Sequence, residues 1–161
     1  MLMEQVGTQV QEKEFTFTTP QVHGLSYKLL NPKSKQFKAN LAKCYNFIDR
    51  SAKASHSVYN LPTDTLVKRC IEQHCDTWVS TRDDKIVGCF TVGVAVYDDN
   101  YGINIESTSG KFVYEDVVPT VEKFYKELGY KFVEISGRKG WERVFKPLGY
   151  NLSRIIIHKE I

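Results

Sequence analysis

The chain of 161 residues lacks any apolar run near the roughly 18 residues that a membrane-spanning helix needs. Its first residues, Met1 to Gln5, also lack the basic flank and the apolar stretch of a secretory signal. An apolar content of 42% with 25% charged residues is an ordinary globular balance, which excludes a fibrous or disordered chain. We therefore expect a soluble, cytoplasmic protein without a membrane partner.

A disulfide framework and a zinc motif are also missing. The chain has four cysteines, Cys44, Cys70, Cys75 and Cys89, scattered among residues whose pattern is buried or helical. Cys70 and Cys75 flank His74, but no second ligand pair follows at zinc-finger spacing. We interpret the four side chains as reduced, buried thiols and predict no metal site.

The sequence contains no repeat, no low-complexity tract and no sign of a second domain. We predict an N-terminal arm over residues 1–22 and a single domain over residues 23–161. Residues 14–19 alternate apolar and polar side chains, which indicates a possible extra strand in the arm. An unpaired strand can add to another sheet, so the arm is a candidate for self-association or for a protein partner.

Positive charge is concentrated near the end of the chain. Residues 131–161 hold seven Lys or Arg against three acids, a local +4, whereas residues 1–130 hold fifteen against sixteen, a local −1. The basic end suits a phosphate-bearing ligand or nucleic acid. The alternative is a solvated helix face, because Lys139, Arg143 and Lys146 have the spacing of a short helix that faces water.

Periodicity predicts a sheet with helices inserted between its strands. The predicted strands cover residues 25–30, 78–82, 85–97, 101–107, 131–136 and 153–158. The predicted helices cover residues 35–54, 64–75 and 114–128, with Thr63 as the cap of the second. Because Pro119 removes a backbone hydrogen bond, the third helix has an alternative start near Val118. Gly88 and Gly93 mark bulges or close backbone contacts.

The last helix has the clearest local pattern. Trp141, Val144, Phe145 and Leu148 recur at i, i+3, i+4 and i+7, which predicts one apolar helical face. Gly149 ends the helix where a left-handed residue is needed.

This order of elements resembles the GCN5-related N-acetyltransferase (GNAT) superfamily. The closing segment from Trp141 to Tyr150, with its Leu-Gly-Tyr ending, is similar to the end of that domain, and the hairpin over residues 78–97 is similar to its second and third strands. The resemblance covers about residues 23–160 and implies an α/β (α+β) fold: a mixed, mostly antiparallel sheet flanked by about four helices. It also implies acetyl-CoA or another acyl-CoA as cofactor, and an amine on a small molecule or a protein as acceptor.

The segment that would hold the cofactor's pyrophosphate departs from the family pattern. Family members carry a loop with several glycines between the fourth strand and the third helix, but residues 107–116 contain only Gly110. We predict that a short anion nest of Ser107, Thr108, Ser109 and Gly110, with Lys111, binds the phosphate instead.

The resemblance assigns two further positions. Glu106 lies on the fourth strand, where a carboxylate can act as the general base; the alternative is a solvent-facing charge. Arg138 follows the fifth strand and is a candidate phosphate ligand, or simply part of a basic turn. Phe145 stands where many members have an acidic tyrosine, so the general acid is unassigned.

Three functions follow. The first is an acyl-CoA-dependent N-acyltransferase with Glu106 as base. The second is a catalytically inactive structural or interaction protein, because small chains with such an incomplete loop resemble proteins of tailed phages, which would place it in a host cytoplasm or a virion. The third is a nucleic-acid-modifying enzyme that uses the basic end of the chain.

Overall fold

A computed structural model describes residues 16–18, 24–54, 61–137 and 140–153. Its six strands form one sheet in the order of the chain: β1 (Thr16–Thr18), β2 (Ser26–Leu29), β3 (Cys75–Arg82), β4 (Lys85–Tyr97), β5 (Asn100–Gly110) and β6 (Val133–Ile135). The first five strands pair antiparallel, and β6 pairs with β5 in parallel. The predicted mixed, mostly antiparallel sheet is confirmed.

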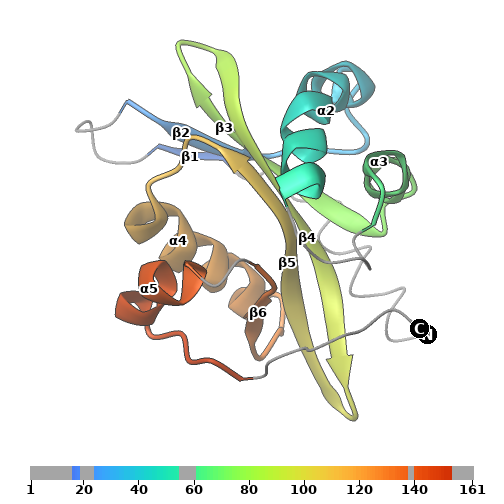
Figure 1. Cartoon of the computed structure of the whole chain (residues 1–161). Helices are drawn as coiled ribbons and strands as arrows, with labels where there is room; N and C mark the ends of the chain where they lie inside the picture. The colour runs from blue at the N-terminus through green and yellow to red at the C-terminus, as the bar shows by residue number, and fades with distance from the viewer. Residues whose placement is uncertain (1–15, 19–23, 55–60, 138–139, 154–161) are drawn as a thin grey trace.

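The helices lie on both sides of this sheet (Figure 1). α2 (Phe37–Ala54) and α3 (Thr63–Ile71) cover one side, whereas α4 (Tyr114–Glu127) and α5 (Trp141–Phe145) cover the other. A single 3-10 turn, η1 (Lys146–Leu148), follows α5 and ends at Gly149, whose φ of 91° is the predicted left-handed cap. The described helices are too short or too polar to cross a lipid bilayer.

The strand predicted in the arm joins the sheet of its own chain. β1 pairs with β2 of the same sheet, with Thr16 opposite Lys28 and Thr18 opposite Ser26. The edge of β2 supplies the partner groups that the isolated strand lacks, so β1 extends the sheet of its own chain.

One predicted helix end and one predicted helix cap were wrong. The helix around residue 70 ends at Ile71, and the hydroxyl of Thr63 donates to Asp49 instead of capping that helix. α4 begins at Tyr114 and contains Pro119, so the later start near Val118 is not used. Tertiary packing of the apolar stripe on α4 outweighs the one hydrogen bond that the proline removes.

The last helix has a narrower buried face than its spacing predicted. Phe145 is buried, but Val144 is 38% exposed, because α5 is only five residues long before η1 tightens the turn. Two predicted features, Arg138 and the strand over residues 153–158, fall outside the described residues apart from Ser153.

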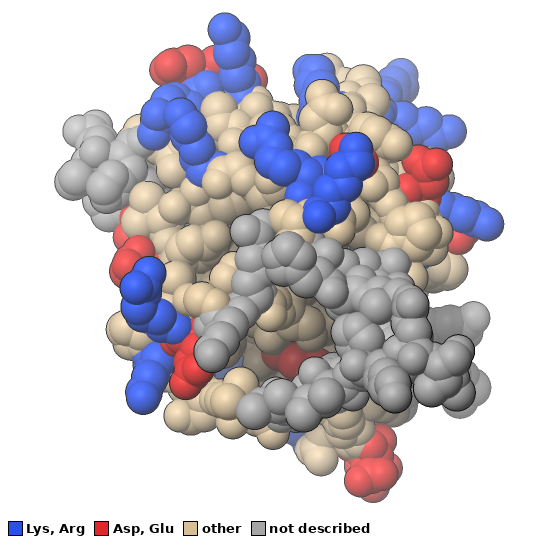
Figure 2. Space-filling view, viewed as in Figure 1, with Lys and Arg blue, Asp and Glu red and all other residues tan. Residues whose placement is uncertain are grey.

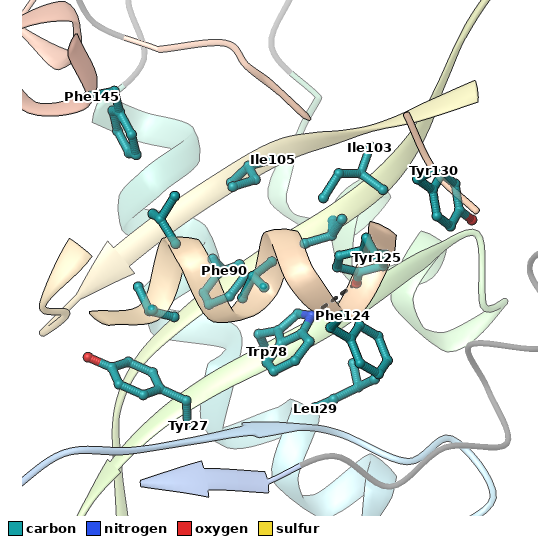
Figure 3. Packing of buried hydrophobic residues seen from close by; sticks show 14 of the residues in the cluster. Tyr27, Leu29, Trp78, Phe90, Ile103, Ile105, Phe124, Tyr125, Tyr130 and Phe145 are labelled. Carbon is teal, nitrogen blue, oxygen red and sulfur yellow. Dashed lines mark hydrogen bonds between the residues drawn. The ribbon is translucent and has the colours of Figure 1, made fainter. Parts of the chain in front are cut away.

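Trp78 is the centre of the core between the sheet and α4 (Figure 3). Its ring stacks on Phe90 at 5.8 Å and meets the edge of Phe124 at 5.5 Å between ring centroids. Its Nε1–H donates to the Tyr125 hydroxyl at 3.0 Å, which in turn donates to an Asp76 carboxylate oxygen at 2.8 Å. Burial raises the pKa of Asp76 to about 7, against the lowering effect of the Tyr125 hydrogen bond.

The core on the other side of the sheet contains all four cysteines. Cys44 on α2, Cys70 on α3, Cys75 on β3 and Cys89 on β4 are buried free thiols, as predicted. The Sγ atoms of Cys70 and Cys75 lie 3.4 Å apart. In the described ranges, no group of three or more His, Cys, Asp or Glu is placed to hold a metal.

We predict that Asp76 makes the stability of the protein depend on pH. The pKa of the Asp76 carboxyl is about 7 in the folded state, against 3.8 for a free aspartate side chain, which represents the unfolded chain. As the pH rises, Asp76 therefore loses its proton in the unfolded chain before it does so in the folded protein. The free energy of unfolding should therefore fall between pH 4 and 7, by on the order of 1–4 kcal/mol. Asp76→Asn keeps the acceptor for Tyr125 and should remove this fall in urea titrations. Identical pH slopes for the two proteins would contradict the assignment.

Candidate functional site

An irregularity in β5 places Glu106 outside the regular strand pairing. Thr91 of β4 is paired with Ser107, but the next residue, Val92, is paired with Ile105. Glu106 is therefore the extra residue of a β-bulge, which breaks the ladder locally and redirects a side chain. Bulges often lie next to binding or catalytic sites for this reason.

Two residues from other elements hold the Glu106 side chain in place. Its Oε1 forms an ion pair of 2.9 Å with Nη2 of Arg69 on α3. Its carboxylate also lies against Gly93 on β4, where a Cβ atom would clash with Oε1. Only a glycine at 93 leaves room for this contact. Glu106 is thus a buried carboxylate that these two contacts hold in place, and not the solvent-facing charge of the alternative interpretation.

The charge of Glu106 is only partly compensated. Its side chain is 12% exposed and that of Arg69 is 30% exposed. Burial raises the pKa of Glu106, while the charge and the hydrogen bond of Arg69 lower it, and the net direction is upward. The second oxygen, Oε2, is buried without a hydrogen-bond partner in the described part of the chain. A carboxylate with a raised pKa and a free acceptor oxygen is suited to take a proton.

A row of buried hydroxyls runs from Glu106 across the sheet. Thr77 is paired with Thr91, and Thr91 with Ser107, so the three side chains lie side by side on adjacent strands. The hydroxyl oxygens of all three, and Oδ1 of Asn104, are buried without a partner among the described residues. Cross-strand Cβ atoms are about 4.5–5.5 Å apart, a spacing that one water can bridge.

The strands β5 and β6 separate beside the bulge. Their pairing ends with Ile105 opposite Ile135, and β5 continues to Gly110. On the α4 side of β5, a cavity of about 20 Å³ lies in this region. It is lined by Phe90, Ile105, Thr108, Phe112, Tyr114, Val118, Val121, Glu122, Val133, Phe145 and Tyr150. The lining is mainly apolar, which suits an acyl chain or the methylenes of a thioester.

One polar contact lies at the wall of this cavity. The Tyr150 hydroxyl donates to Oε1 of Glu122 at 2.6 Å. Burial and the Glu122 carboxylate both raise the pKa of Tyr150. Both effects keep the Tyr150 phenol protonated at neutral pH.

The predicted phosphate ligands are not arranged as a loop. Ser107, Ser109 and Gly110 lie within β5, where alternate residues point to opposite faces, so they do not form the predicted nest. The exposed Lys111 follows the strand, and its backbone N–H donates to the Val87 carbonyl at 3.0 Å. Arg138 lies outside the described residues.

A nucleic-acid-binding surface would be continuously basic, and the described residues on the face in Figure 2 do not form such a surface. Among the described residues on this face, Lys and Arg side chains are interspersed with Asp and Glu. Several of the basic residues that motivated the nucleic-acid hypothesis, including Lys139, are outside the described ranges.

Comparison with solved structures identifies the fold. No family model matches the sequence, and no curated protein is similar to it in sequence. A predicted acetyltransferase from Clostridium acetobutylicum, solved with acetyl-CoA, has a TM-score of 0.62 and 9% identity over 84% of this chain and 96% of that one. A Trypanosoma brucei acetyltransferase has a TM-score of 0.59 and 11% identity over 85% and 99%.

An aminoglycoside acetyltransferase from an uncultured soil sample, in complex with trehalose, has a TM-score of 0.58 and 14% identity over 87% of this chain and 97% of that one. These similarities extend over nearly the whole length of each neighbour. The chain has the GNAT acetyltransferase fold, as its order of elements predicted.

We predict that Gly93→Ala disrupts the contact between the Glu106 carboxylate and β4. The added methyl group would clash with Oε1 and force the carboxylate away from Arg69. We expect a loss of about 1–3 kcal/mol in the free energy of unfolding. The matched control is Gly140→Ala, because Gly140 has a φ of −66° and no atom lies within 4 Å of an added Cβ. A loss of the same size in the control would contradict the specific clash.

We also predict that Arg69 controls the protonation of Glu106. In Arg69→Gln, the cation that lowers the pKa of Glu106 is lost and the burial that raises it persists, so this pKa should rise. Arg69→Lys keeps the positive charge, so the pKa of Glu106 should stay close to its wild-type value. Carbon NMR of labelled glutamate carboxyls as a function of pH measures this directly. An unchanged titration in Arg69→Gln would show that the ion pair is absent in solution.

Proposed function

We propose that the protein is an acyl-CoA-dependent N-acyltransferase that acts on an amine, with Glu106 as its general base. The observation that carries this proposal is the place of Glu106: a buried carboxylate at a bulge, next to the point where β5 and β6 separate. The apolar cavity lies on the opposite side of the same strand. The base and the cavity therefore lie on opposite faces of β5, and we propose that the donor reaches from one face to the other through the gap between β5 and β6.

Acyl transfer to an amine needs a group that removes a proton from the nitrogen, because an ammonium ion has no free electron pair for attack. Burial raises the pKa of Glu106, which strengthens it as a base, and the charge and hydrogen bond of Arg69 oppose this rise. Oε2 is available to accept the proton, since no described residue hydrogen-bonds to it.

The acyl donor fits this site at one end. The thioester and its acyl group suit the cavity beside Ile105 and Phe145, although its present volume requires these side chains to move. Lys111, exposed at the end of β5, is the described residue that we propose for a phosphate of the donor. Among the structural neighbours, one was solved with acetyl-CoA, which supports a donor of this class.

The acceptor reaches Glu106 from the α3 side. Arg69 is the more exposed member of the ion pair, so we propose its side of the sheet for the entry of the acceptor. One neighbour is an aminoglycoside acetyltransferase in complex with sisomicin, which supports a small amine-bearing acceptor here. The interaction protein stays the alternative function, because β1 pairs with β2 on one side and is the edge strand of the described sheet on the other.

Replacement of Glu106 by Gln tests the proposal. This change preserves shape but removes the base, so kcat/KM for acetyl transfer to a panel of amines should fall about 100-fold or more. Binding of acetyl-CoA, measured by isothermal calorimetry, should be unchanged. Glu127→Gln on the exposed surface of α4 is the control and should behave as wild type. No heat with acetyl-CoA or CoA at millimolar concentration would refute the proposal.

A further inference from the structure

The segment that should bind the donor's pyrophosphate is occupied by contacts within the protein. β5 continues to Gly110, which is paired with Gly88 of β4. A Cβ at Gly110 would clash with Cα of Gly88 and with the Val87 carbonyl. The glycine is therefore needed for the close approach of two strands.

Three backbone N–H groups around this segment already have acceptors. The N–H of Thr108 donates to the Ser51 hydroxyl at 3.1 Å, and that of Lys111 donates to the Val87 carbonyl at 3.0 Å. The N–H of Val113, at the start of α4, donates to the Tyr27 hydroxyl at 2.9 Å. A phosphate cradle needs several such donors free at once, because it binds through converging N–H groups.

The first turn of α4 also carries negative charge. Glu115 and Asp116 lie in this turn, where their carboxylates interact favourably with the positive end of the helix dipole. A pyrophosphate at the same place would be repelled by both. In the described residues next to this turn, Lys111 is a single cation against these two acids.

We infer that this chain recognises its acyl donor by the acyl-pantetheine half and gains little from the 3′-phospho-ADP half. This inference rests on the proposed function. The apolar cavity, once its side chains move, and the edge of β5 beyond Ile105 suit an uncharged amide chain with a thioester, and the described residues around the end of β5 provide no cradle for the pyrophosphate end. The same acyl-phosphopantetheine chemistry occurs in free acyl-CoA and on acyl carrier proteins.

Truncated donors test the inference. Acetyl-CoA, acetyl-4′-phosphopantetheine and acetyl-pantetheine should give kcat/KM values within about threefold of one another with the full chain. Loss of about 100-fold or more on removal of the 3′-phospho-ADP group would overturn the inference and leave the proposed function intact. Absence of turnover with all three donors, together with no binding, would overturn both.

Two variants and one further donor sharpen the result. Arg138→Ala should leave the ratio of kcat/KM for acetyl-CoA to kcat/KM for acetyl-pantetheine unchanged. A large fall in this ratio in the variant would reveal a pyrophosphate site and refute the inference. Lys111→Ala should abolish the small preference for phosphopantetheine over pantetheine. An acetyl-loaded carrier protein used more than about tenfold better than acetyl-CoA would identify the carrier as the source of the donor, and equal use would identify free thioesters.

Discussion

One extra residue in β5 determines the layout of the candidate site. Because Glu106 has no partner on β4, the ladder shifts at this point, and both Glu106 and Ser107 lie on the α2–α3 side of the sheet. Without the bulge, strict alternation would place these neighbours on opposite faces. The bulge therefore allows a carboxylate and the row of hydroxyls to share one side, while Ile105 and Thr108 line the cavity on the other.

The surrounding structure is adapted to this constraint. Gly93 has no side chain where the carboxylate lies, and Arg69 reaches from α3 to neutralise part of its charge. β6 is only three residues long and ends opposite Ile105, which leaves the edge of β5 accessible beside the bulge. On the far side, the contacts of Trp78 with Phe124 and Tyr125 anchor α4, which forms the opposite wall of the cavity.

The sequence predicted the order of elements, because period-two and period-3.6 patterns and the ending Leu148-Gly149-Tyr150 are local signals. The role of Glu106 as a base came from the resemblance to the GNAT superfamily and stays a prediction. The sequence did not predict the ion pair with Arg69 or the contact of Glu106 with Gly93, because both depend on contacts between distant elements. It also placed residues 107–110 in a loop, whereas pairing with β4 keeps them in the strand. A serine-rich segment has weak strand propensity, and the available edge of β4 outweighs it.

A crystal structure with a non-hydrolysable thioether analogue of acetyl-CoA tests the central claim most directly. The account predicts that the sulfur lies between β5 and β6 next to Ile105, with the reacting carbon between the apolar cavity on one face and Glu106 on the other, and the adenosine end poorly ordered. A sulfur bound elsewhere on the chain, or an ordered pyrophosphate at the start of α4, would contradict it.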